Sequence, residues 1–219
     1  MNTFAKSVGT DLAYDILKTQ AGTDPGVMED LIEAGKDWIP TAVAICQEVS
    51  KKTLWQGRIR FPNQPGAGTT INSSGFVNSM QPLLGSAFFQ RLTTEGQVKV
   101  VEAYWDGIQR VLPEAFNTDP TKFSIQRSLG VQILHKMMLD VIEVLRAQSK
   151  DVTDPEAYAD VVRDSLLNLS GESLEQGRVS GVDFWRSGRS GAAGSFSSNA
   201  GRRVLVSQMK RELPKFDLS

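Results

Sequence analysis

Apolar residues recur at three- and four-residue steps through the middle of the chain, which is the spacing that places side chains on one face of an α-helix. The clearest run lies at 94–112, after threonines that can cap a helix and before Pro113. A longer run at about 125–147 is the best candidate for the centre of the core, and a third follows Asp154-Pro155. We expect these three helices to form the main packed body, because each carries an apolar stripe that the others can cover.

Shorter runs with the same spacing predict three more helices before residue 53. Apolar residues at 12–17 indicate the first, which ends near Gly22. Asp24-Pro25 opens the second, since proline is favoured in the first turn of a helix. A mostly apolar stretch at 38–49 forms the third.

Alternation of apolar and polar residues replaces the helical spacing at 54–61, which predicts a strand. The stretch 62–68 is rich in proline and glycine and predicts turns, and 69–72 can supply a partner strand. We therefore expect a small two-stranded ribbon near 54–72 with basic residues on one side.

The last part of the chain changes character, because glycine and serine dominate Ser187–Gly201 and leave little apolar surface to bury. Such tracts are usually connectors, so the first interpretation is a flexible link to a terminal helix capped by Asn199. The alternative is an anion site, since a glycine-rich turn leads into a helix with Arg202 and Arg203 in its first turn.

These patterns predict a mainly α fold. We expect a helical, bundle-like domain at 1–183 with the β insertion near 54–72, and a Gly/Ser-rich basic segment with a terminal helix at 184–219 that packs on the same domain. The chain has 219 residues, of which 40% are hydrophobic and 22% charged, as in ordinary globular proteins.

Three further features bear on location. No apolar run approaches the roughly 20 residues that span a bilayer, so no membrane segment is expected. The stretch Met1–Lys18 mixes charged and apolar residues and lacks the order of a signal peptide. The single cysteine, Cys46, cannot form an internal disulfide, which fits a reducing compartment. The sequence therefore predicts a cytoplasmic protein.

A formal net charge of −1 hides an uneven distribution of charge. No Asp or Glu lies between Val49 and Thr94, and none lies between Phe184 and Arg211, whereas both stretches are basic. A local positive field attracts polyanions even when the whole chain is nearly neutral. An ordinary solvated surface is the alternative interpretation. The candidate phosphate-contacting residues are Lys51, Lys52, Arg58, Arg60, Arg186, Arg189, Arg202 and Arg203.

Catalytic and metal templates find little support. The only histidine, His135, is remote in sequence from Cys46, and no His/Cys set has zinc spacing. The glycine-rich run at 188–195 lacks the lysine of a phosphate loop. Asp160 and Asp164 share a helix face, but without other ligands a solvated surface is the stronger interpretation. The sequence thus predicts no catalytic residues, metal or cofactor, and no activity of the chain alone.

Four segments occur in an order that resembles the C-terminal portion of DGQHR-domain proteins. They are INSSGFVNSMQPLLG from Ile71, VKVVEAYWDGIQRVLPEAF from Val98, FSIQRSLGVQILHKMM from Phe123 and FWRSGRSGAAG from Phe184. The similarity extends over about 11–213, but the Asp-Gly-Gln-His-Arg motif that names the family is absent.

The resemblance implies a role beside bacterial DNA modification, including phosphorothioation, or defence. ATP hydrolysis reported for some members belongs to the motif-bearing half, so this chain would be a helical accessory portion that contacts DNA. The alternatives are a protein-interaction domain that docks on a motif-bearing partner or self-associates, and, ranked last, part of a nucleotide site completed by a partner chain.

Overall fold

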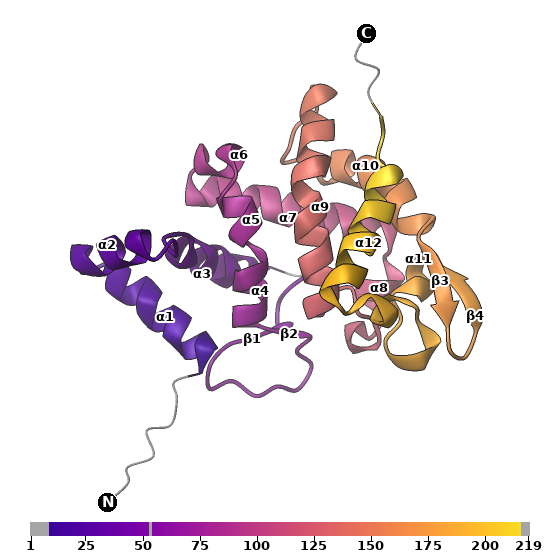
Figure 1. The fold of residues 1–219 in the computed structure, drawn as a ribbon, viewed down its shortest axis with the longest axis horizontal. Coiled ribbons are helices and arrows are strands. Elements are labelled where there is room, and N and C mark those ends of the chain that lie inside the picture. The colour runs from indigo at the N-terminus through magenta and orange to yellow at the C-terminus, as the bar shows by residue number, and fades with distance from the viewer. Residues whose placement is uncertain (1–8, 53, 216–219) are drawn as a thin grey trace, which may run out of the picture.

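The computed structural model describes residues 9–52 and 54–215, and it confirms the mainly α fold (Figure 1). Residues 1–8, 53 and 216–219 lie outside this part, so it does not cover the outer ends of the predicted 1–183 and 184–219 units or the beginning of Met1–Lys18. The α-helices of the described chain are α1 (Thr10–Ala21), α2 (Pro25–Glu33), α3 (Trp38–Val49), α4 (Ser73–Ser79), α5 (Gln81–Leu84), α6 (Ala87–Gln90), α7 (Thr94–Val111), α8 (Glu114–Asn117), α9 (Ser128–Ala147), α10 (Pro155–Leu167), α11 (Gly181–Phe184) and α12 (Asn199–Arg211).

The three longest predicted helices, α7, α9 and α10, form the central body. Tyr104 of α7 is fully buried, and its hydroxyl donates a hydrogen bond to the carbonyl oxygen of Leu134 on α9 at 2.8 Å. Where α7 meets α10, a Cβ added to Gly107 would lie 2.6 Å from Tyr158 Cβ. The apolar stripes therefore face one another, and the closest approach requires a residue without a side chain.

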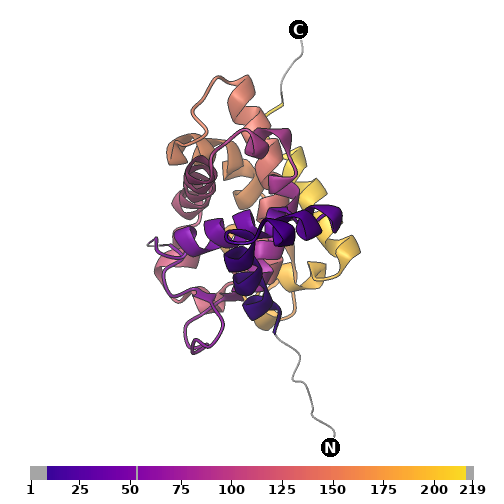
Figure 2. The same cartoon turned by 90° about the vertical axis from the view of Figure 1, so that its left-hand side faces the viewer.

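The N-terminal helices lie on one side of this body and the C-terminal segment on the other (Figures 1 and 2). α1 packs on α3, which in turn contacts α4 and α7. Asp24 caps α2 by accepting a hydrogen bond from the backbone N–H of Gly26 at 2.9 Å, as an Asp-Pro helix start predicts. Asp11 of α1 accepts hydrogen bonds from Ser73 and Ser74 at the start of α4, which fixes the first helix against the fourth.

The β insertion is smaller than predicted. β1 (Ile59–Arg60) and β2 (Ile71–Asn72) pair in parallel over two residues each. The expected strand at 54–61 is wrong over its first half, because the backbone N–H groups of residues 55, 56 and 58 bond back to carbonyl oxygens three or four residues earlier and form turns. These turns carry Trp55 into the core, where it is 1% exposed and packs edge-on against Phe76 and Trp105.

A second two-stranded sheet was not predicted. β3 (Ser170–Ser173) and β4 (Gly177–Ser180) form an antiparallel hairpin, closed by a turn in which Gly177 has a positive φ of 68°. Only Ser173 and Val179 are buried in it, so the apolar alternation that announces a half-buried strand is missing.

The Gly/Ser tract at 187–201 is a packed element, which corrects the expected flexible connector. It contains two 3₁₀ turns, η2 (Gly188–Ser190) and η3 (Ala193–Phe196), and Ala192 and Ala193 are buried. A Cβ on Gly191 would lie 1.8 Å from the carbonyl oxygen of Arg186, so the small side chains permit close backbone packing.

The terminal helix α12 completes the fold. Ser198, and not Asn199, is its cap, since the Ser198 hydroxyl accepts from the N–H of Gly201 at 3.0 Å. The hydroxyl of Ser165 on α10 donates to the carbonyl of Met209 at 2.8 Å, which holds α12 on the body. In the described ranges, no helix has the length and apolar character needed to cross a membrane.

Candidate nucleic-acid interface

The eight predicted phosphate contacts lie in four places in the structure. Lys51 and Lys52 follow α3, Arg58 and Arg60 flank the start of β1, Arg186 and Arg189 follow α11, and Arg202 and Arg203 occupy the first turns of α12. They differ in whether a carboxylate already pairs with their positive charge.

Half of the eight are already paired with carboxylates. The Nζ atom of Lys51 lies 2.6 Å from Glu48 Oε1, and that of Lys52 lies 3.6 Å from Glu102 Oε1. Arg189 Nε lies 3.5 Å from Glu175 Oε1. Exposed pairs of this kind are weak, but each one reduces the positive potential available to a phosphate.

Arg186 is the most strongly engaged of the paired residues. Its guanidinium contacts Asp183 at 2.6 Å and Glu114 at 2.8 Å, and its Cζ lies 5.3 Å from the ring centroid of Phe123. The hydrogen bond with Asp183, followed by that with Glu114, raises the pKa of Arg186. This arrangement ties the loop after α11 to α8, so we assign Arg186 a structural role.

Arg58, Arg60, Arg202 and Arg203 form no ion pair with a carboxylate in the described part of the chain. Arg58 donates to the carbonyl of Gly68 at 3.3 Å, and Arg202 donates to the carbonyl of Ser197 and to Gln132 of α9. Arg60 and Arg203 are exposed. These four are the predicted residues whose charge remains available.

Two further basic residues gather near Arg58, around the short 3₁₀ turn η1 (Pro120–Lys122). Hydrogen bonds from Thr121 lower the pKa of the Asp119 carboxyl, and the charges of Lys122 and Arg58 add to this effect. Arg127 donates to the carbonyl of Thr121 at 2.5 Å. Gln126 donates to the carbonyl of Leu54 at 3.1 Å, which holds the turns before Arg58 against the segment that carries Lys122 and Arg127. We call Arg58, Lys122 and Arg127 the basic cluster.

Sequence reasoning missed Lys122 and Arg127. The same test that found the other candidates would have found them, because no Asp or Glu lies between Asp119 and Asp140 whereas three basic residues do. That stretch also holds most of the run that is the best candidate for the centre of the core, which drew attention to its apolar face.

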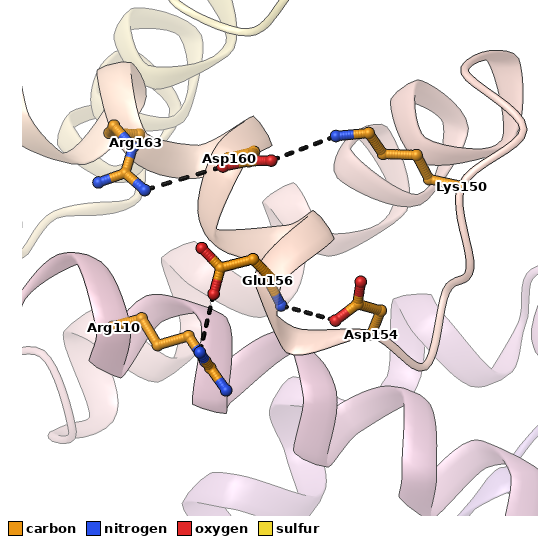
Figure 3. A network of polar contacts seen from close by, with 6 residues as sticks. All are labelled: Arg110, Lys150, Asp154, Glu156, Asp160 and Arg163. Atoms are coloured by element: carbon orange, nitrogen blue, oxygen red, sulfur yellow. Dashed lines mark hydrogen bonds and ion pairs between the residues drawn. The ribbon is translucent and has the colours of Figure 1, made fainter.

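A cavity of about 680 Å³ lies next to this region, between the end of α3, α7 and α8. Burial raises the pKa of Glu102 and of Asp106, which line it from successive turns of α7. Arg110 at its rim pairs with Glu156 of α10 at 2.8 Å (Figure 3). The lining residues are Lys52, Leu54, Trp55, Glu102, Trp105, Asp106, Gln109, Arg110, Pro113 and Asn117.

The residues weighed as nucleophile and base are in the core. His135 is fully buried, its Nδ1 lies 2.7 Å from Ser79 Oγ, and its Nε2 accepts from Trp105 Nε1 at 3.0 Å. Burial lowers the pKa of His135 to about 3, so the imidazole is neutral. Cys46 is buried elsewhere in the core, and burial raises the pKa of its thiol.

The acidic pair on α10 does not form a metal site. Asp160 pairs instead with Lys150 at 3.3 Å and with Arg163 at 3.8 Å (Figure 3). Within 9–52 and 54–215, no group of three His, Cys, Asp or Glu residues is arranged to hold a metal ion.

Comparisons with known proteins give no matching family model, no similar curated protein and no similar solved structure. The resemblance to DGQHR-domain proteins therefore rests on the four sequence segments alone.

Proposed function

We propose that this chain is a non-catalytic accessory domain that binds nucleic acid through sequence-independent contacts with phosphates. The observation that carries the proposal is the basic cluster, where the segment before Arg58 lies against the segment that carries Lys122 and Arg127. Arg60, next to Arg58 on β1, extends it. The neighbouring carboxylate of Asp119 accepts hydrogen bonds from the backbone N–H and the hydroxyl of Thr121.

Arg202 and Arg203 are secondary phosphate contacts in this proposal. Lys51, Lys52, Arg186 and Arg189 contribute less, because a phosphate would have to compete with the carboxylates that already pair with them. The resemblance to DGQHR-domain proteins favours DNA within a modification or defence system as the nucleic acid.

The test is fluorescence anisotropy with labelled duplex and single-stranded DNA at low salt. A variant carrying Arg58→Ala, Lys122→Ala and Arg127→Ala should bind at least about tenfold more weakly, since it removes three phosphate contacts. The matched control is Lys99→Ala, Lys150→Ala and Arg163→Ala, which removes the same charge from exposed ion pairs elsewhere. Figure 3 shows the pairs of Lys150 and Arg163. Equal losses in both variants would contradict a localised interface.

A second candidate function is docking on a protein partner or on a second copy of the chain. It is favoured by large apolar side chains exposed on the N-terminal helices, with Leu12 and Ile16 one turn apart on α1 and Ile32 58% exposed on α2. Sedimentation at rising concentration would detect self-association, and Ile16→Lys with Ile32→Lys should abolish it. If the chain stays monomeric at all concentrations, self-association is excluded, and docking on a separate protein is the remaining form of this function.

A further inference from the structure

Two helices at opposite ends of the chain carry charges of one sign only. α2 contains three acidic residues and no basic one, whereas α12 contains four basic residues and no acidic one. Surfaces of opposite charge attract each other, and this attraction steers two proteins into a particular arrangement. The exposed sides of these two helices are therefore candidates for a contact with each other.

The exposed side of α2 combines its acids with an apolar side chain. Ile32 is 58% exposed and lies one turn after Glu29, and Glu33 also lies one turn after Glu29. All three acids of α2 are exposed, and none of them forms an ion pair within 9–52 and 54–215. Lys36 and Asp37 follow the helix, and their charges cancel. The residues of this surface, which we call the α2 face, are Glu29, Asp30, Ile32 and Glu33.

The exposed side of α12 has the same composition with the opposite charge. Val204 is 50% exposed, and the exposed Arg203 and Arg211 share its side of the helix. Neither arginine pairs with a carboxylate in the described part of the chain. Lys210 already pairs with Asp140 at 2.7 Å and is left out of this surface. We call Arg203, Val204 and Arg211 the α12 face.

The two faces lie on opposite sides of the central body (Figures 1 and 2). α2 packs on α1, whereas α12 packs on α9 and α10. One chain therefore does not bring its own two faces together, but two copies can. In such a contact the apolar side chains of both faces would be covered, and guanidinium groups would meet carboxylates, which they bind with strong, charge-assisted hydrogen bonds.

We propose that copies of this chain associate head to tail, with the α12 face of one copy on the α2 face of the next. The contact joins two different surfaces, so its repetition builds a ring or an open chain and not a symmetric dimer. The inference rests on the second candidate function, self-association, and not on nucleic-acid binding. Because single helix faces bury little area, we expect the association to be weak and sensitive to salt.

The test is sedimentation velocity of the full chain at rising concentration in roughly 0.05 and 0.5 M salt. The protein is first freed of nucleic acid, because Arg203 is also a secondary phosphate contact. The wild type should form dimers and larger species at low salt and dissociate at high salt. Arg203→Glu with Arg211→Glu should weaken association at least about tenfold, because like charges then face each other. Lys99→Glu with Lys150→Glu is the matched control, since it makes the same change of charge on exposed residues elsewhere.

Mixing two defective variants tests the head-to-tail arrangement itself. Glu29→Gln, Ile32→Ser and Glu33→Gln together remove the α2 face and leave the α12 face intact, whereas the arginine variant does the reverse. Each variant should be monomeric alone. Their mixture should form 1:1 complexes that grow no further, because each complex has used the one intact face of each copy.

Three outcomes would overturn the inference. If the wild type stays monomeric at every concentration, docking on a separate protein is what remains of the second candidate function. Association that neither variant weakens would mean that other surfaces make the contact. Variants that fail alone and form no mixed complex would rule out the head-to-tail arrangement. Arg203→Gln with Arg211→Gln serves as the second variant if the Glu replacements lose their helical circular dichroism. The nucleic-acid function is tested separately, by the DNA binding of the basic cluster.

Discussion

The central helical body and the Gly/Ser tract at 187–201 reach the same packed state by opposite means. In the body, long apolar side chains of α7, α9 and α10 fill the space between helices, and glycine is needed only at a few close contacts such as Gly107 and Gly130. In the tract, the backbone itself packs, and Gly191 fits because it has no side chain. A segment of low apolar content is therefore expected to be flexible only when its small residues do not pack the backbone closely against the rest of the protein.

The largest expected effect in this comparison is at Gly191. Gly191→Ala would place a Cβ 1.8 Å from the carbonyl oxygen of Arg186, a backbone atom that cannot rotate away. We expect a loss of about 3 kcal/mol in the free energy of unfolding, measured by urea denaturation. Gly194→Ala is the control, since a Cβ there meets nothing within 4 Å. Equal stability of the two variants would mean that the tract is a loose connector after all.

A smaller loss is expected at Gly107 in the body. A Cβ there meets Tyr158 Cβ at 2.6 Å and the carbonyl of Pro155 at 2.9 Å, and overpacking of this kind costs about 2 kcal/mol. The higher helix propensity of alanine returns up to about 1 kcal/mol, so Gly107→Ala should destabilise less than Gly191→Ala. Gly96→Ala, on the same helix with contacts no closer than 3.5 Å, should not destabilise. The reverse order of the two losses would refute the comparison.

A third effect, comparable in size to that at Gly107, is a pH dependence that belongs to the body. The folded pKa of His135, about 3, lies below the ordinary value of 6.5, so its contribution is complete above pH 6.5 and is lost as the pH falls toward 3. Between pH 7.5 and 5.5 the free energy of unfolding should fall by about 1.4 kcal/mol. Glu102 and Asp106 have raised pKa values and act in the opposite direction, but they are only partly buried.

Urea denaturation at the two pH values measures this change. His135→Gln should lower stability at both, because Ser79 and Trp105 lose their imidazole partner, and should flatten the dependence on pH. A slope that persists in the variant would show that another group titrates in this range.

Helical periodicity predicted the body well because the same apolar side chains define both the pattern and the packing. The sequence offered no comparable signal for the β3–β4 hairpin, because few of its side chains are buried. It also gave no signal for the position of Trp55, which is carried into the core by turns and not by a strand. Runs of unopposed charge include Arg58 and Arg60, which form no ion pair with a carboxylate within 9–52 and 54–215. They could not show that Arg186 meets Glu114, because Glu114 is distant in the sequence.

The same limit applies to the cavity. Glu102 and Asp106 look like ordinary surface acids on an amphipathic helix, and only the fold brings Trp55 and Lys52 against them. Spacing along a helix predicts which side chains share a face, but it does not predict which other segment covers that face.

The measurement that tests the central claim most directly is the salt dependence of DNA binding by the wild-type chain and by the Arg58→Ala, Lys122→Ala, Arg127→Ala variant. Each phosphate contact with duplex DNA contributes roughly 0.9 to the slope of log K against log salt concentration. The account predicts that the slope of the variant is shallower by about 2 to 3. Identical slopes for the two proteins would contradict it, because the basic cluster would then make no contact with phosphate.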